Sequence, residues 1–377
     1  MPATSPSSPR EAARPELRAL TGLRFFVAAH VVLYHFAGAA LPDATPALVR
    51  NFIGHGYVGV SFFYLLSGFI LTYSYAERSG DGVRLRGTSR RFFARRLARI
   101  YPLYLLAWLL AAPFVIAHRF GGGDSILTAL AKLGASALVS LSLAQAWLPG
   151  ANTWWNPPGW SISVEAFFYL AFPWLLPRLV PRRASLAAFV ALYVAALVPP
   201  LVHLLARGGE TSLAAVKYNP LCHLPVFAMG MLLARAFDSP LRAAVERHRG
   251  VFLTLGLAAS LAVVARPVDA LYLFIHNGLL APAFGACLLA VATSRRASAY
   301  LASPTLVLLG EASYGVYILQ APLWLGWRRL ARVASLDLAP LVDFALYFAA
   351  LCAISLLAFK LLESPARRIL RARMETA

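Results

Sequence analysis

Long apolar blocks separated by short basic loops are the feature that most limits what this chain can fold into. A helix needs roughly 20 predominantly apolar residues to cross the hydrocarbon core of a bilayer. Hydrophobic residues make up 59% of the chain and charged residues 14%, a balance that excludes an ordinary soluble domain. The sequence therefore predicts an all-α, polytopic transmembrane helical bundle. Its eleven apolar blocks are residues 19–40, 57–76, 100–118, 126–147, 161–180, 184–206, 220–237, 250–265, 270–293, 304–327 and 339–362.

The distribution of positive charge predicts how these blocks cross the membrane. Lys and Arg total 35 against 16 Asp and Glu, but they cluster between apolar blocks, as in loops retained in the cytoplasm, so nucleic-acid binding is not expected. If all eleven blocks crossed, the basic groups from residues 178–183 onward would lie outside the cell. We therefore predict ten crossings, with either 126–147, which contains Lys132, or 161–180 re-entrant or interfacial. Both termini are then cytoplasmic, and the protein lies in the lipid bilayer of the cell (inner) membrane.

Outside the apolar blocks the chain has little material for a second domain. Residues 1–16 are rich in Pro, Ser and Ala and are expected to form a disordered cytoplasmic tail. Residues 17–370 are expected to form the transmembrane domain, and 371–377 a short cytoplasmic tail. The 3 cysteines have no paired spacing, so neither a disulfide framework nor a zinc site is predicted. We expect no metal and no permanently bound cofactor.

The stretch RFFVAAHVVLYHF, residues 24–36, places an arginine and two histidines inside the first apolar block. On a helix Arg24 and His35 project from one face, about 16 Å apart along the axis, whereas His30 points about 120° away. Ionisable side chains inside a membrane usually face a protein interior or a wet cavity and mark functional sites. The alternatives are snorkelling of Arg24 to the membrane surface and a simple interhelical hydrogen bond for His35. We favour function for His35, because imidazole is the natural general base near neutral pH.

A cluster of arginines precedes the third block, in RRFFARRLARIYP. Arg91, Arg95 and Arg99 recur at four-residue spacing and Arg96 lies three residues before Arg99, so a helix would gather them at the membrane surface. The planar guanidinium suits the recognition of phosphate, such as the phosphates of an acyl-CoA donor. The alternative is an anchor on anionic lipid headgroups, which the residues alone favour.

The fifth block contains a single carboxylate, in NPPGWSISVEAFFYLAFPWLLP. Glu165 shares a helical face with Ser161 and Tyr169 if the helix starts near Pro158. A purely structural Glu165 would interact with the helix dipole or form a buried ion pair with a neighbouring helix. Three tryptophans lie nearby: Trp154, Trp155 and Trp160. For them an interfacial belt is favoured over a platform that stacks on sugars.

Taken together, these stretches resemble the membrane-bound acyltransferase family 3. LRALTGLRFFVAAHVVLYHF is similar to the family's first helix, with an arginine, ten residues and a histidine, and GYVGVSFFYLLSGFILTYSY to its second, including Ser67–Gly68. Arg96-Leu97-Ala98-Arg99 matches the Arg-x-x-Arg element, which the resemblance implies is needed for activity. WSISVEAFFY matches the signature W-S-x-x-x-E-x-x-F-Y, which implies an active-site or donor-channel role for Glu165. That role is to orient His35, to bind the acceptor or to pair with Arg24.

The C-terminal part of the chain completes the resemblance, which covers about residues 17–370. LGEASYGVYILQAPL resembles the penultimate helix of the family, and LLESPARR its closing motif. The chain departs from the family at Ser61, where relatives often have Asp, and at Gln320, where many have His. Gln takes up no proton at neutral pH, so no second catalytic histidine is expected. We expect structural roles for Glu363 beside Arg367 and for His203, His223 and His276.

The resemblance implies an integral-membrane O-acyltransferase that moves an acyl group, most simply acetyl from acetyl-CoA, onto a hydroxyl of a carbohydrate or glycolipid. Arg95, Arg96 and Arg99 are expected to bind the acyl-CoA donor, with Arg24 along its route and His35 deeper inside as general base or acyl relay. The alternatives are a proton-coupled secondary transporter that uses Arg24, His35 and Glu165, and a non-catalytic membrane protein.

Overall fold

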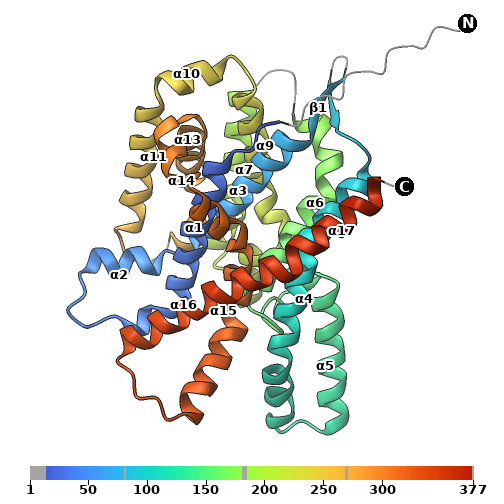
Figure 1. Cartoon of the computed structure of the whole chain (residues 1–377), viewed down its shortest axis with the longest axis vertical. Coiled ribbons are helices and arrows are strands. Elements are labelled where there is room, and N and C mark those ends of the chain that lie inside the picture. The colour runs from blue at the N-terminus through green and yellow to red at the C-terminus, as the bar shows by residue number, and fades with distance from the viewer. Residues whose placement is uncertain (1–13, 80–81, 181–184, 268–270, 376–377) are drawn as a thin grey trace, which may run out of the picture.

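The computed structural model describes residues 14–79, 82–180, 185–267 and 271–375. Apart from the short antiparallel strands β1 (Ala76–Ser79) and β2 (Gly82–Leu85), its regular structure is helical, as predicted (Figure 1). The first half contains α1 (Arg18–Phe36), α2 (Ala47–Gly54), α3 (Val58–Tyr75), α4 (Ser89–Gly121), α5 (Ile126–Leu141), α6 (Gly159–Leu179) and α7 (Leu186–Leu205). The second half contains α8 (Glu210–Tyr218), α9 (Pro220–Phe237), α10 (Leu241–Arg247), α11 (Arg249–Val264), α12 (Tyr272–His276), α13 (Ala281–Thr293), α14 (Arg295–Leu301), α15 (Pro304–Val333), α16 (Pro340–Ala358) and α17 (Ser364–Glu375).

The apolar helices correspond one to one with the predicted blocks. Among the described residues, 9 helical stretches are long and apolar enough to span a membrane, and the shorter α5 and α11 account for the other two blocks. This confirms an all-α polytopic bundle. A π-helical segment, Phe359–Glu363, joins α16 to α17 without a break.

The path of the helices explains how eleven blocks are compatible with ten passes. α5 ends at Leu141, and the next residues fold back on the start of α6, where Gln145 donates to the Gly159 carbonyl at 2.8 Å and Ser163 to that of Leu143. α5 and α6 therefore make one pass between them (Figure 1). If α5 and α6 form one crossing, the described helices correspond to the ten crossings predicted: α1, α3, α4, α5 with α6, α7, α8 with α9, α11, α12 with α13, α15, and α16 with α17. The number of membrane crossings and their direction stay predictions.

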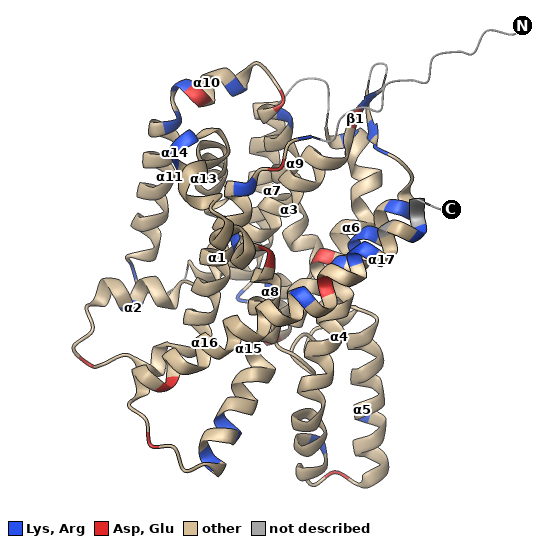
Figure 2. Ribbon diagram, in the orientation of Figure 1, with Lys and Arg blue, Asp and Glu red and all other residues tan. Residues whose placement is uncertain are grey.

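Basic side chains gather at one end of the bundle, which we call the basic end and define by β1–β2, α10, α14 and α17 (Figure 2). The predicted basic groups at 78–99, 235–249, Arg295–Arg296 and the C-terminal helix lie there, while 181–184 lie outside the described residues. The opposite end holds a smaller group in the last turns of α15 that the sequence analysis did not include, Arg328, Arg329 and Arg332. Arg328 is paired with Asp343 at 3.0 Å.

Two glycines bring the backbones of α3 and α9 into direct contact at the centre of the bundle. A Cβ added at Gly68 would lie 2.0 Å from the carbonyl oxygen of Phe227, and one at Gly230 2.0 Å from that of Leu65. Small residues allow such close approach between membrane helices, where packing provides much of the association. Within the Ser67–Gly68 pair of the sequence motif, Gly68 therefore has a structural role: it allows α3 and α9 to pack closely.

Replacement of Gly68 by Val is expected to prevent this approach and to destabilise the protein by more than about 3 kcal/mol, because a backbone carbonyl cannot move aside as a side chain can. The yield of monodisperse protein in detergent and its unfolding temperature measure the loss. Gly134→Val in α5 is the matched control, since a Cβ there meets nothing within 4 Å. An unchanged unfolding temperature in Gly68→Val would show that the two helices can separate at no cost.

Candidate active site

A central cavity of about 170 Å³ lies between α1, α3, α4, α6 and α15. Three arginines line it, Arg24 from α1 and Arg96 and Arg99 from α4, together with Glu165 from α6 and Glu311 from α15. The bundle therefore brings together four of the six predicted site residues, which come from three separate segments of the chain. The remaining polar lining consists of hydroxyl groups: Thr21, Ser67, Ser161, Ser313, Tyr64, Tyr169, Tyr314 and Tyr317.

A second, outer cavity of about 320 Å³ adjoins the first on the side of the basic end. Its lining is strongly cationic: Arg95, Arg96, Arg99 and Arg367, with Ala98 and Leu370. Arg96 and Arg99 line both cavities and so lie at the boundary between them. Arg95 lines only the outer cavity, where its side chain is exposed. The sequence predicts a structural role for Glu363 beside Arg367, but it does not predict that Arg367 lies among these arginines.

The arginines of the two cavities differ in whether a protein group already engages them. Arg96 donates to the Tyr75 hydroxyl at 3.0 Å and lies over the Tyr75 and Tyr169 rings. In contrast, no hydrogen bond or ion pair to another described residue is made by Arg24 or Arg99. A positive charge in an enclosed site is costly unless an anion compensates it, so these two guanidinium groups are the ones available to a ligand.

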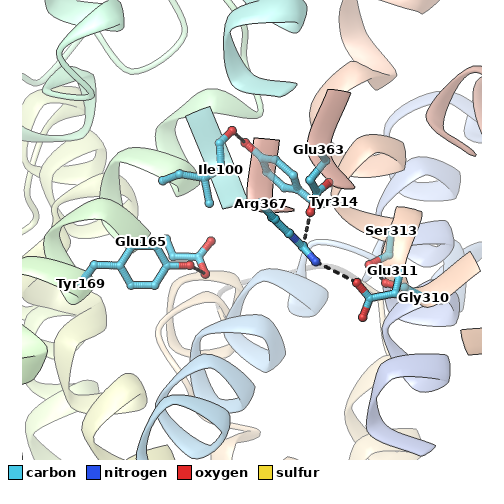
Figure 3. A network of polar contacts seen from close by, with 9 residues as sticks. All are labelled: Ile100, Glu165, Tyr169, Gly310, Glu311, Ser313, Tyr314, Glu363 and Arg367. Carbon is cyan, nitrogen blue, oxygen red and sulfur yellow. Dashed lines mark hydrogen bonds and ion pairs between the residues drawn. The ribbon is translucent and has the colours of Figure 1, made fainter. Parts of the chain in front are cut away.

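Glu165 is held by neighbouring hydroxyls (Figure 3). Its Oε1 accepts a hydrogen bond from the Tyr169 hydroxyl at 2.6 Å and a longer one from Ser67 at 3.4 Å. Among the described residues it forms no ion pair with Arg24 within 4.0 Å and no hydrogen bond with His35. Glu165 thus presents a fixed carboxylate to the central cavity.

Arg367 links the two remaining carboxylates near the cavities (Figure 3). Its guanidinium donates to Glu311 at 3.1 Å and to Glu363 one turn earlier, the ion pair that sequence analysis expected. Glu363 is 0% exposed and ends the π-helical segment, and such irregular turns are frequent at functional sites. This network fixes one wall of the outer cavity and connects it to Glu311 in the central one.

His35 lies at the far end of α1 from Arg24, and a buried amide orients it. Its Nδ1 is 3.0 Å from Oε1 of Gln320, whose Nε2 donates to the Tyr317 carbonyl at 2.7 Å. Because the Gln320 NH₂ group is already used, its oxygen accepts and His35 Nδ1 carries the proton. The Nε2 atom is then unprotonated and makes no hydrogen bond within the described part of the chain. This is the form of imidazole that acts as a base.

The central cavity does not include His35, and this corrects the expectation of one passage with His35 at its inner end. The Ser161 and Tyr317 side chains, which line the cavity, are joined by a hydrogen bond of 2.7 Å between α6 and α15. Gln320 lies one turn beyond Tyr317 on α15 and contacts His35. The imidazole therefore lies next to residues that line the cavity but is not part of the lining itself.

The prediction of an interfacial tryptophan belt is wrong for two of the three residues. Trp155 is 6% exposed, stacks on Trp108 at 4.1 Å and donates to its carbonyl, and Trp160 is 8% exposed. Trp160 packs against His223 and His276, both almost completely buried. The segment before α6 folds back into the bundle and brings these rings inside, which hydropathy does not reveal.

The family described as an acyltransferase domain matches residues 17–360. Acyltransferase MdmB of Streptomyces mycarofaciens is 30% identical over 318 residues, which cover 80% of this chain and 77% of that protein. Nodulation protein 10 of Rhizobium leguminosarum bv. viciae is 26% identical over 69% of this chain and 70% of its own length. Protein 2 in the picA locus of Rhizobium radiobacter is 40% identical over 66 residues, 17% of this chain and 33% of its own.

These matches define a multi-pass membrane acyltransferase. The chain belongs to the acyltransferase family whose domain model it matches over residues 17–360, the family that its motifs resemble. No solved structure matches the chain significantly.

Proposed function

We propose that this acyltransferase moves an acetyl group from acetyl-CoA to a hydroxyl of a carbohydrate or glycolipid, with its basic end and both termini on the cytoplasmic side of the cell (inner) membrane. The observation that carries the proposal is the pair of unpartnered arginines, Arg24 and Arg99, in a cavity whose outer part is lined by further arginines. That arrangement fits a polyanion with a long arm, and a basic end facing the cytoplasm faces the CoA pool.

In this proposal the donor enters through the outer cavity. Its phosphates bind Arg95 and Arg99, with Arg96 beside them in the same lining, and guanidinium groups suit phosphates because each can donate two parallel hydrogen bonds to phosphate oxygens. The thioester arm then extends into the central cavity past Arg24. Glu165 accepts a hydrogen bond from an amide of that arm, since a carboxylate is an acceptor only.

The chemical step uses the unprotonated Nε2 of His35. It removes the proton of the acceptor hydroxyl as the oxygen attacks the thioester carbon, a C–O bond forms, the C–S bond breaks, and the proton passes to the leaving CoA thiolate. In the alternative route Nε2 attacks the thioester first, an N–C bond forms, the C–S bond breaks and CoA leaves as the thiolate. The acceptor oxygen then attacks the acyl carbon, the N–C bond breaks, and the hydroxyl proton passes to the thiolate. Either route requires the thioester to reach beyond the lining of the central cavity, because His35 is not among the residues that line it.

Acyl transfer by purified protein in liposomes tests the function directly. Acetyl-CoA with a radiolabelled acetyl group is supplied with glycans from the source cells, and released CoA is measured together with label in the glycan. We expect both products in equal amounts. A proton-coupled transporter would move substrate without releasing CoA, and that result would overturn the proposal.

Replacement of Glu165 by Ala is expected to reduce the turnover of acetyl transfer about 10- to 100-fold, because it removes the acceptor for the donor arm and a charge that balances the arginines. Tyr169→Phe is the matched control, since it removes the 2.6 Å hydrogen bond to Glu165 but keeps the carboxylate. We expect Tyr169→Phe to lose less than tenfold. Equal losses in both variants would show that only the Tyr169–Glu165 contact matters.

A further inference from the structure

A cluster of side chains begins beside His35, at the end of α1 that is far from Arg24. We call it the lysine–tyrosine cluster and define it as Tyr34, Lys217, Tyr218 and Tyr272. Its members come from α1, α8 and α12, elements that are distant in the sequence. The ring of Tyr34 lies 5.0 Å from that of His35, and the Tyr57 ring packs on both Tyr34 and Tyr272, at 5.5 Å and 4.6 Å. The cluster therefore begins directly beside the proposed base.

Lys217 is the unusual member. Its Nζ lies 5.2 Å from the centre of the Tyr218 ring and 5.1 Å from that of Tyr272, and no carboxylate within 4.0 Å pairs with it in the part of the chain that the structure describes. A half-buried ammonium without a counter-ion lacks the compensation that such groups usually have, and a bound anion would provide it.

The surroundings of Lys217 suit a ligand rich in hydroxyl groups. The four members offer three phenol hydroxyls, which both donate and accept, and ring faces that pack on the C–H surface of a sugar. The Tyr218 ring packs against the Trp160 ring, with the ring centres 5.0 Å apart. Trp160 is itself only 8% exposed. This contact holds Tyr218 in place before a ligand arrives.

We propose that the lysine–tyrosine cluster binds the acceptor of the acyl group, and that the acceptor carries an anionic group, a carboxylate or a phosphate, close to the hydroxyl that His35 deprotonates. Lys217 pairs with the anion and the tyrosines bind the sugar ring. The assignment of the ligand as acceptor rests on the proposed function. Binding of an anionic sugar at this place does not require the donor and is measured separately.

A purely structural role of Lys217 predicts different results for its variants. Cation–π contact with two rings would hold α8 against α12, with no preference among sugars. Loss of the ammonium would then lower the unfolding temperature and leave ligand selectivity as it was. The experiment must therefore compare ligands that differ only in charge.

Binding of three sugar probes to the purified full chain in detergent, followed by tryptophan fluorescence, makes this comparison. The probes are methyl glucoside, methyl glucuronide and methyl glucoside 6-phosphate. For the wild type we expect an anionic probe to bind at least about tenfold more tightly than the neutral one, and the two anions decide between carboxylate and phosphate. Lys217→Gln should reduce this preference to less than about twofold, and Lys217→Arg should keep most of it.

Lys132→Gln is the matched control, because Lys132 is paired with Asp124 at 2.8 Å on α5, away from the cluster. Equal affinities of all three probes for the wild type, no binding of the anionic probes, or an unchanged preference in Lys217→Gln would each overturn the proposal. Binding of acetyl-CoA to the same preparations separates the two proposals. If acetyl-CoA is bound and transferred but no charge preference exists, the cluster assignment fails and the acyltransferase proposal stands.

Discussion

Replacement of His35 by Ala is expected to reduce acetyl transfer by about a thousandfold, since a positioned general base commonly contributes 10²–10⁴-fold. The physical reason is the fixed form of the imidazole. Gln320 accepts from Nδ1 at 3.0 Å, so Nε2 has the free electron pair, and alanine supplies no other base at this place. Gln320→Leu should lose less, about tenfold, because the ring remains but its orientation and tautomer are no longer held.

Transfer of radiolabelled acetyl to acceptor, with the amount of folded protein measured in parallel, tests the role of His35. His30→Ala is the matched control on the same helix, because His30 contacts Phe52 through its carbonyl at 2.7 Å and its ring, away from the proposed base. We expect His30→Ala to transfer acetyl at nearly the wild-type rate. Transfer retained by His35→Ala would remove the imidazole from the mechanism. Acid-quenched wild-type protein that carries label on His35 would identify the relay route.

Replacement of Arg99 by Ala is expected to weaken acetyl-CoA binding about 100-fold. Arg99 lines both cavities and has no hydrogen-bond or ion-pair partner among the described residues, so a donor phosphate gains its full interaction. Hydrogen bonds to charged groups contribute about 1.5–3 kcal/mol, and Arg99 can make two to one phosphate. Arg99→Lys should recover only part of the affinity, because an ammonium is a point charge and not a planar fork.

Titration of the purified variants with acetyl-CoA, together with the KM of the donor, measures this loss. Arg91→Ala is the matched control, since Arg91 is exposed on the same helix two turns earlier and lines neither cavity. Both variants remove one positive charge, so a loss caused by long-range attraction alone would be equal in the two. Equal affinities of Arg99→Ala and Arg91→Ala for acetyl-CoA would refute a phosphate site at Arg99 and support a lipid anchor.

Several residues of the candidate site could be found in the sequence, by two different signals. Arg24 and Glu165 are ionisable groups inside apolar blocks, Arg96 and Arg99 match a spaced basic element just before one, and the bundle places all four around one cavity. Arg367 and Lys217 were not found. Arg367 lies in a basic tail where arginines are expected, and Lys217 lies in a short helix between apolar blocks, so neither contradicts its local surroundings.

The sequence by itself determined the class of fold and the candidate side chains. Hydrophobic periodicity and length depend only on neighbours along the chain, and they predicted eleven apolar segments and the common face of Arg24 and His35. Only the tertiary structure decided which space each side chain lines. A hydrogen bond between Ser161 and Tyr317, from helices far apart in the sequence, joins two residues of the lining that the arginines share, and His35 is not part of that lining. Such a contact depends on how two helices pack across the bundle, and no spacing within either helix specifies it.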